Sequence, residues 1–478
     1  MAIADKVWKM ADILKKAGVS FTDYVSQLTY LLFLKMDAEQ AEIYKQNPLV
    51  PESCRWSSLY ALDGEELADA YADALYTLSD QPNILGVIYK DAQNKITKPA
   101  HLRRVMEMIE AESWLALDVD VKGAIYESIL EKNASAEKGA GQYFTPRALI
   151  RAIVDVMRPT AKLNIHDPFC GTGGFLLGAY EYIHKQNPDF KDLERLKKRG
   201  LSGNDISPLV VSLASMNMYL HGIGAAKDAN LPISCRDTLV EPEARSFEMV
   251  LANPPFGAGA NVMEGIGAIS LTDDRFFAVT SNTQLNAVQH IMAVLTPTGR
   301  AAVVVPDNVL WANDTAGIKV REKLLAQFNL HTILRLPTGI FYAQGVQANV
   351  IFFDKCPPDA EKHHTQKIWV YDYRTNIKHT LVQNKLKREH LDDFVACYHA
   401  EDISRRKETY SVDNPDGRWR CYDYADVLKR PNLSLDFSWI KPLEDTIEGS
   451  VEDLVGMLEQ EIAKQQNALA ELKKQLQL

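Results

Sequence analysis

The segment best suited to chemistry in this sequence is Asn253-Pro254-Pro255-Phe256, which directly follows the apolar run 247–252. The run predicts a buried strand, so the segment is expected to be a loop at the strand's carboxyl edge. Two consecutive prolines fix φ at about −65° and keep Asn253 out of the α region, which holds its side chain and the nearby carbonyls in place. Such a loop can offer two acceptors to one amino group, and Phe256 can stack on a planar base. The alternative is a simple strand-ending turn, because Asn and Pro are common in turns.

A second candidate lies upstream, where Asp167 and a glycine-rich loop follow the apolar stretch 163–166 and precede a predicted helix through Tyr180. This order is typical of nucleotide-binding sites, because glycines turn tightly and place no Cβ between main chain and ligand. The loop lacks the lysine of a P-loop and does not match G-x-G-x-x-G. An acid at the strand end repels a pyrophosphate, so we expect a cationic or hydroxyl-bearing ligand. The candidate ligand-binding residues here are Asp167, Gly171, Thr172, Gly173, Gly174 and Phe175.

Two further acids, Asp205 and Asp237, follow the next predicted strands. Asp205 stands where a ribose diol is usually held, and Asp237 could reach an adenine amino group. Each acid alone is more simply a helix cap or a turn residue. Three acids at successive strand ends nevertheless favour a ligand site.

A third segment, Gly-Gln-Tyr-Phe-Thr-Pro-Arg at 141–147, precedes both of these. With this segment first, the glycine loop second and Asn253 to Phe256 third, the chain resembles the γ arrangement of amino-methyltransferases that modify adenine N6 in DNA. More narrowly, it resembles the modification subunit of type I restriction-modification systems. The resemblance covers about residues 110 to 355, and the stretches 120–127, 217–222 and 299–306 support it.

The resemblance implies S-adenosyl-L-methionine as the cofactor and direct methyl transfer to N6 of an adenine flipped out of duplex DNA. It assigns catalysis to Asn253, Pro254, Pro255 and Phe256, adds Gln142, Tyr143, Phe144 and Thr145 to the cofactor-binding residues, and requires no metal. Asparagine at position 253, where cytosine-N4 enzymes often have serine, favours adenine. The alternatives are a methyltransferase acting on RNA or on a protein glutamine amide, and a catalytically inactive scaffold.

The resemblance also implies partners: a specificity subunit that reads the DNA sequence, a restriction subunit with motor and nuclease activity, and two copies of this chain per complex. Near the C-terminus, apolar residues recur at heptad spacing from Val451 to Leu476, interrupted by Gln465. A helix of this kind must cover its apolar seam, so we expect it to contact the specificity subunit. Folding back onto its own chain is the alternative.

Composition limits the other possibilities. A net charge of −10 over 478 residues is unusual for a protein that grips DNA alone, because DNA affinity normally comes from Lys and Arg. The runs 197–199 and 385–388 are basic, although such runs are usually solvated surface. Six scattered cysteines predict neither a metal site nor a disulfide framework. Without a spanning apolar run or a signal peptide, we expect a cytoplasmic protein with no membrane partner.

The predicted fold class is α/β, in four parts. Helical periodicity, as in Tyr24, Leu28 and Leu31, predicts an N-terminal helical domain over residues 1–135. A Rossmann-like, S-adenosylmethionine-dependent methyltransferase domain follows over 136–375, with a doubly wound, mostly parallel, seven-stranded sheet. Residues 376–442 form a mixed connecting region, and 443–478 form a C-terminal amphipathic helix. Thr145 is expected to cap a helix whose first residue is Pro146.

Overall fold

The computed structural model describes residues 3–45, 48–114, 145–226, 228–256, 273–341, 346–357, 363–381 and 384–443. The predicted cofactor-binding residues Gln142, Tyr143 and Phe144 lie outside the described residues, as does the predicted C-terminal helix apart from residue 443. Chain contacts divide the protein into a unit of residues 1–439 and a unit of residues 440–478. No described helix is both long enough and apolar enough to cross a membrane.

The N-terminal part consists of helices around one apolar core. Its elements are α1 (Ile3–Lys16), α2 (Phe21–Tyr44), the 3₁₀ turn η1 (Glu52–Cys54), α3 (Trp56–Tyr60), α4 (Gly64–Ser79), α5 (Ile84–Ile88) and α6 (Pro99–Glu110). The residues that recur at helical spacing in α2 and α6, such as Leu28, Leu31, Leu102 and Val105, are fully buried in this core. The sequence periodicity therefore identified the packed faces of both helices.

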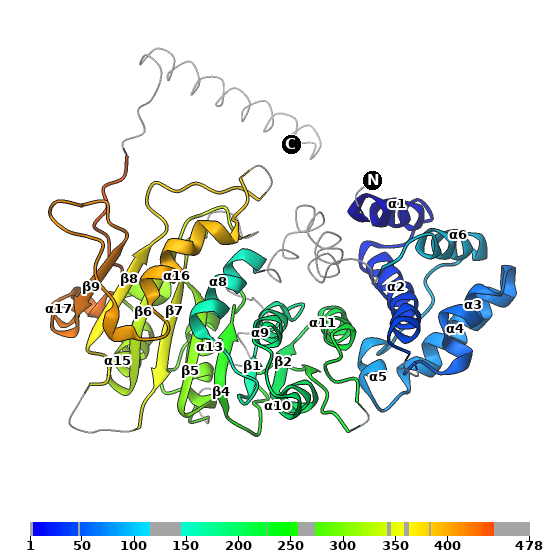
Figure 1. The fold of residues 1–478 in the computed structure, drawn as a ribbon, viewed down its shortest axis with the longest axis horizontal. Helices are drawn as coiled ribbons and strands as arrows, with labels where there is room; N and C mark the ends of the chain where they lie inside the picture. Colours follow the sequence, from blue (N-terminus) through cyan, green and yellow to red (C-terminus); the bar gives the residue numbers. More distant parts are fainter. Residues whose placement is uncertain are drawn as a thin grey trace, which may run out of the picture. The chain divides into compact units, whose positions relative to one another are not determined.

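The rest of the unit is built on a nine-stranded mixed sheet of order β3-β2-β1-β4-β5-β7-β6-β8-β9 (Figure 1). The strands are β1 (Ile165–Asp167), β2 (Leu201–Asp205), β3 (Ile233–Cys235), β4 (Phe247–Ala252), β5 (Leu295–Pro306), β6 (Phe328–Leu336), β7 (Ala348–Lys355), β8 (Lys367–Asp372) and β9 (Trp419–Asp423). β7 runs antiparallel to β5 and β6, and β9 runs antiparallel to β8. The other neighbouring pairs are parallel.

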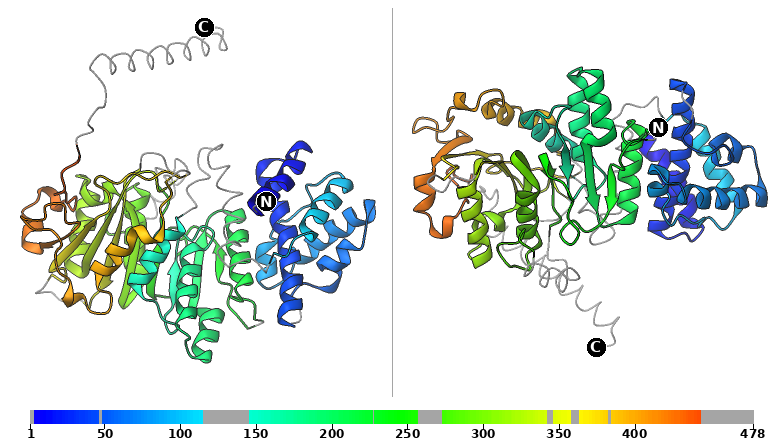
Figure 2. Two further views of the ribbon diagram at one scale, coloured as in Figure 1. Left: turned by 45° about the horizontal axis from the view of Figure 1, so that its top comes forward. Right: turned by 90° about the horizontal axis from the view of Figure 1, so that it is seen from below.

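Helices cover both faces of this sheet, as the view from below shows (Figure 2, right). The helices and helical turns of this part are α8 (Arg147–Met157), α9 (Gly174–Lys185), α10 (Phe190–Arg195), the π-helical turn η3 (Leu196–Gly200), α11 (Pro208–Leu220), α13 (Thr283–Val294), α14 (Asp307–Trp311), α15 (Thr315–Gln327), η4 (Arg388–Leu391), α16 (Asp392–Tyr398), η5 (Ile403–Arg405), α17 (Tyr424–Leu428) and η6 (Pro431–Leu433). Alternate strand residues pack on opposite sides, with Val304 and Phe352 against the α8 and α9 layer and Val303 and Phe353 against the α13 and α15 layer. Continuous apolar strands follow from burial on both faces.

The sheet differs from the expected seven-stranded, mostly parallel one. The doubly wound part consists of the first seven strands in the spatial order, which begins with β3 and reaches β6. The strands β8 and β9 extend it by two strands. Both added strands come from sequence with little apolar periodicity. The rings of Tyr371 in β8 and Trp419 in β9 pack with Phe394 of α16. Residues beyond 375 thus continue the sheet, while the division of the chain into domains remains a prediction.

Helix α11 is buried on all sides and joins the N-terminal helices to the sheet. Leu213 and Met216 pack into the N-terminal core, while Ala214 and Met218 pack against the sheet layer. The Tyr219 hydroxyl donates to Asp37 Oδ1 at 2.6 Å on the N-terminal side. One helix therefore contacts both parts of the unit.

Candidate active site

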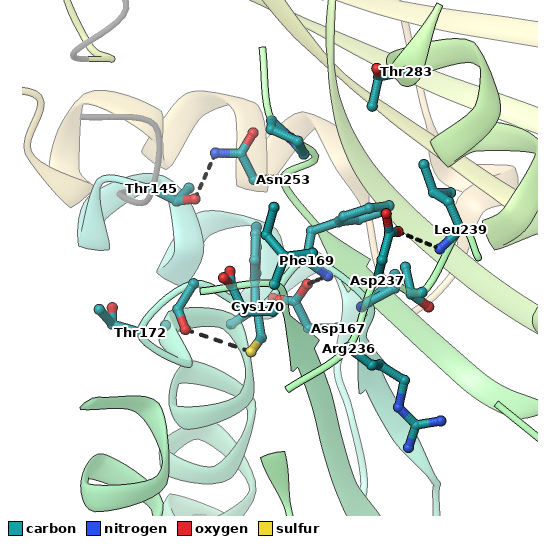
Figure 3. A pocket seen from close by; sticks show the side chains of 18 of the residues that line it. Thr145, Asp167, Phe169, Cys170, Thr172, Arg236, Asp237, Leu239, Asn253 and Thr283 are labelled. Atoms are coloured by element: carbon teal, nitrogen blue, oxygen red, sulfur yellow. Dashed lines mark hydrogen bonds between the residues drawn. The ribbon is translucent and has the colours of Figure 1, made fainter. Parts of the chain in front are cut away.

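A pocket opens at the carboxyl edge of β1, β2, β3 and β4 and has about 1010 Å³ of empty volume, counting the part open to solvent. The carboxyl ends of neighbouring parallel strands meet at one edge, where α/β proteins usually bind ligands. The pocket is lined by Thr145, Ile150, Asp167, Pro168, Phe169, Cys170, Gly171, Thr172, Gly174, Phe175, Asp205, Ile206, Arg236, Asp237, Thr238, Leu239, Asn253, Pro255 and Thr283 (Figure 3).

Ten of the sixteen residues predicted from the sequence line this pocket: Thr145, Asp167, Gly171, Thr172, Gly174, Phe175, Asp205, Asp237, Asn253 and Pro255. Gly173, Pro254 and Phe256 lie beside it without lining it. Their assigned roles, and those of the three residues outside the described part, stay predictions. Among the residues that sequence reasoning missed, Phe169, Ile206 and Leu239 share a signal: each is apolar and follows one of the three acids by one or two positions.

The three acids share one local geometry. Each carboxylate accepts a hydrogen bond from the backbone N–H two residues later, at 3.1 Å for Asp167 and Phe169, 2.8 Å for Asp205 and Ser207, and 3.0 Å for Asp237 and Leu239. Each acid is therefore a turn residue and also lines the pocket. The turn fixes the carboxylate at its strand end, because the side chain is bound to its own backbone.

Two of these carboxyls are hard to ionise. Burial raises the pKa of Asp167 well above its ordinary value, and the nearby Asp205 adds to the rise while the Phe169 N–H opposes it. Burial also raises the pKa of Asp205 to about 6, against the opposing effect of the Ser207, Gly171 and Ile206 N–H groups. A ligand that is cationic, or that donates hydrogen bonds, would stabilise the ionised forms.

Asp205→Asn is expected to stabilise the ligand-free protein near neutral pH. With a folded pKa of about 6 above an unfolded value of about 3.9, the folded state binds the proton more tightly. Stability therefore falls as pH rises through this window. Asparagine can still accept the Ser207 N–H but carries no charge, so the gain is at most about 3 kcal/mol above pH 6 and disappears below about pH 4. Urea unfolding at about pH 5 and pH 7.5 measures it, and a variant less stable than wild type at the higher pH would contradict it.

The glycine loop is shaped by its contact with α11. Gly173 adopts φ of 83°, and a Cβ there would meet Met218 Cε at 2.7 Å. The Asn217 amide donates to the Thr172 carbonyl at 3.1 Å. The stretch 217–222, which supported the family resemblance in the sequence, therefore contacts and supports the glycine loop.

The loop after β4 is held by side chains from three other segments. The Asn253 amide nitrogen donates to the Thr145 hydroxyl at 2.9 Å (Figure 3). The Gln284 amide, from α13, donates to the Pro255 carbonyl at 2.9 Å. Phe256 is buried, and its ring meets Phe341 edge-on at 5.5 Å. Sequence reasoning missed both Gln284 and Phe341, which are distant in the chain.

One buried atom of this loop has no hydrogen-bond partner among the residues that the structure describes. The Oδ1 atom of Asn253 is inaccessible to solvent and accepts no hydrogen bond from any described residue. Leaving a buried acceptor without a hydrogen bond costs about 1 to 3 kcal/mol of folding free energy. Such an acceptor is therefore expected at a site where a bound ligand donates the missing hydrogen bond. Asn253 lines the pocket, which makes the pocket the place from which that donor would come.

The start of the neighbouring helix differs from the prediction. Pro146, not Thr145, is the N-cap of α8, which begins at Arg147 and has no side-chain cap. Pro146 has an extended ψ of 130°, and the Thr145 hydroxyl instead accepts from Asn253. The expected cap was wrong because the hydroxyl is used in a tertiary contact.

A buried polar network lies next to the three acids. The Asn204 amide donates to Glu243, the Thr238 hydroxyl donates to Glu243 Oε2 at 3.3 Å, and His166 Nε2 lies 3.4 Å from the same oxygen. His166, Asn204 and Thr238 are the chain neighbours of Asp167, Asp205 and Asp237, respectively. The Glu243 carboxylate therefore contacts one chain neighbour of each of the three acids.

The network continues to α13 and fixes a histidine tautomer. Arg275 Nη1 donates to Nδ1 of His290 at 2.8 Å, so Nδ1 is an acceptor and Nε2 carries the proton toward the Thr238 hydroxyl at 3.0 Å. Burial, followed by the charge of Arg275, lowers the pKa of His290 to about 3. His290 is thus neutral at physiological pH.

Both basic runs that were considered for DNA contact have acidic partners. Lys198 belongs to the run that precedes β2, at the sheet edge opposite the pocket, and it pairs with Asp228 at 2.8 Å. Arg388 pairs with Asp155 at 2.5 Å. These ion pairs favour the solvated-surface interpretation of both runs.

Comparison with known proteins gives consistent matches. A profile of the N-6 DNA methylase family matches residues 117–416, and a profile of the HsdM N-terminal domain matches residues 3–109. The methylase subunit of the type I restriction enzyme StySPI of Salmonella potsdam is 36% identical, over 91% of this chain and 87% of its own length. The methylase subunit of EcoKI from Escherichia coli K12 has the same identity and coverage.

Solved structures agree. The crystal structure of the EcoKI M protein aligns with a TM-score of 0.56 and 31% identity, covering 98% of this chain and 96% of that chain. A modification subunit of a putative type I restriction enzyme from Vibrio vulnificus YJ016 aligns with a TM-score of 0.72 and 25% identity, covering 88% and 92%.

Proposed function

The chain belongs to the N-6 DNA methylases and, among them, to the methylase subunits of type I restriction enzymes, and we propose that its pocket binds S-adenosyl-L-methionine beside an adenine held by Asn253. The family makes it an adenine-specific DNA methyltransferase. The alternatives, methyl transfer to RNA or to a protein glutamine and an inactive scaffold, are not favoured by any of these relatives.

The observation that carries the proposed site is the buried, unpartnered Oδ1 of Asn253 at the pocket. An exocyclic amine is a weak nucleophile because its lone pair is delocalised into the ring. An acceptor at Asn253 Oδ1 would bind one N6–H and favour localisation of that lone pair. The Pro254 carbonyl, which accepts no hydrogen bond from a described residue, is the candidate second acceptor, because the Pro255 carbonyl already accepts from Gln284.

The remaining pocket residues fit the cofactor. When bound, S-adenosyl-L-methionine supplies the electrophilic methyl group. Asp205 is assigned to ribose hydroxyls and Asp237 to an adenine amine, while Asp167 and the glycine loop would face the rest of the molecule. Ile206, which is 63% exposed at the pocket, offers an apolar surface that a planar base would cover. Holding the reactants in line in a dry pocket is expected to provide most of the rate enhancement.

Partners are part of the proposal. Relatives are subunits of type I restriction enzymes, and a solved structure that aligns with a TM-score of 0.70 and 25% identity concerns complex assembly and conformational transition of the type I restriction-modification system. We assign sequence readout to a specificity subunit, contacted through the predicted helix 443–478, and restriction to a third subunit, with two copies of this chain per complex. The net charge of −10 supports shared DNA binding. Six free cysteines support a reducing, cytoplasmic location.

The test is methyl transfer from labelled S-adenosyl-L-methionine to duplex DNA by the chain with its specificity subunit. Mapping should place the label at N6 of adenine in one sequence context. Label found only in RNA or protein would favour the alternative substrates, and no label at all would favour the scaffold.

Asn217→Ala tests the support beneath the cofactor loop. Loss of the bond to the Thr172 carbonyl should raise the Kd for S-adenosyl-L-methionine about 3- to 10-fold, the equivalent of one hydrogen bond, while saturating cofactor restores most of the rate. Titration calorimetry measures this. Ser212→Ala is the control, because it removes the bond to the Ile88 carbonyl on the other face of the same helix and should leave the Kd unchanged. Equal effects of the two variants would show that the whole helix matters rather than Asn217.

A further inference from the structure

The contact between Asn253 and Thr145 joins residues 108 positions apart in the chain. Asn253 comes from the end of β4, and Thr145 comes from the approach to α8. The amide nitrogen donates to the hydroxyl at 2.9 Å, and the amide oxygen is the buried atom without a partner. The two ends of one amide therefore have different surroundings.

The orientation of this amide decides what the target base meets. An amide presents an acceptor at its oxygen and two donors at its nitrogen. An exocyclic amine is itself a donor, so it can bind only the oxygen end. In this structure the Thr145 hydroxyl accepts from the nitrogen end of the amide. This contact leaves the oxygen end as the acceptor without a partner among the described residues.

We propose that Thr145 is a positioning residue that fixes the Asn253 amide with its oxygen toward the target amine. This rests on the proposed function, in which Asn253 receives that amine. The sequence resemblance assigned Thr145 to cofactor binding, whereas the contact assigns it to the orientation of the acceptor. Thr145 acts through Asn253 and does not itself touch the reacting atoms.

The rest of the loop is held independently, so the effect of Thr145 can be isolated. Gln284 holds the Pro255 carbonyl, and Phe341 packs against Phe256. Removing the Thr145 hydroxyl leaves both contacts in place and frees only the rotation of the Asn253 amide.

Thr145→Val and Thr145→Ser separate this role from others. Valine has the shape of threonine without the hydroxyl, so single-turnover methylation by the complex with the specificity subunit should slow about 10- to 100-fold. The Kd for S-adenosyl-L-methionine should stay within about twofold of wild type. Serine keeps the hydroxyl and should restore most of the rate.

A base analogue gives a readout that a purely structural role would not change. Hypoxanthine carries a carbonyl at position 6, so the fixed Asn253 oxygen should repel it. In Thr145→Val the amide can turn and donate to that carbonyl. Using S-adenosylhomocysteine as the bound cofactor, the DNA affinity penalty for hypoxanthine relative to adenine should shrink about fivefold or more in the valine variant, and serine should retain the wild-type penalty.

Several results would overturn the inference. A valine variant with a wild-type rate would do so, as would weaker cofactor binding with an unchanged rate at saturation, which would return Thr145 to cofactor binding. A serine variant as slow as valine, or an unchanged hypoxanthine penalty, would equally contradict it. If the wild-type complex formed no N6-methyladenine, the proposed function would fail together with this inference.

Discussion

Asn253→Ala is expected to slow methyl transfer about 10³-fold while the protein keeps its fold and its cofactor affinity. The variant removes the amide oxygen that has no partner among the described residues, from a residue that lines the pocket. Loss of an electrostatic contact to a reacting group typically costs about 10²- to 10³-fold in rate. Because the Pro254 carbonyl would remain as the only acceptor for N6–H, we place the loss at the upper end. Single-turnover transfer to a duplex containing the mapped site measures it.

The matched control is Asn308→Ala, whose buried amide oxygen also lacks a partner among the described residues but lies in α14 and does not line the pocket. That variant should keep its transfer rate. Cofactor titration separates the outcomes for Asn253→Ala. A slow variant with wild-type cofactor affinity supports the proposed role, whereas loss of cofactor binding together with the rate would indicate that Asn253 supports the pocket rather than the base.

The strands and their ends followed from the sequence. Apolar runs identified β4 and the other central strands, since strands buried on both faces must be continuously apolar. Once the strands are parallel neighbours, residues that follow them meet at one edge. Asp167, Asp205, Asp237 and Asn253 therefore converged as expected, because the fold class alone places strand ends together.

The contacts between distant segments did not follow from the sequence. Thr145 reads locally as a helix cap, and only the tertiary structure reveals that its hydroxyl accepts a hydrogen bond from Asn253. Gln284 and Phe341 have no local pattern that predicts contact with the loop, because side-chain pairing between separate elements depends on tertiary packing. The strands β8 and β9 were missed for a related reason: with 6 and 5 residues, they are too short to show a clear period.

Glu243→Ala is the second large effect we expect, and it is an effect on stability. The carboxylate accepts from Asn204 and Thr238 and lies against His166 in a buried site. Removing one member of such a network leaves the others without partners, which typically costs about 3 to 5 kcal/mol. Because the network connects the strand ends that carry Asp167, Asp205 and Asp237, cofactor affinity should also fall. Chemical denaturation and cofactor titration measure the two effects.

The pH dependence distinguishes the charge of Glu243 from its bulk. Burial opposes ionisation, but His166 and the Asn204 amide hold the pKa of Glu243 at about 2, below the usual unfolded value of about 4.3. A lowered folded pKa contributes stability above about pH 4.3 that is lost as pH falls toward about 2. The deficit of Glu243→Ala relative to wild type should therefore shrink through this window. Glu241→Ala, two residues away and exposed, should match wild type throughout. A Glu243→Ala variant as stable as this control would show that the network does not hold the three acids in place.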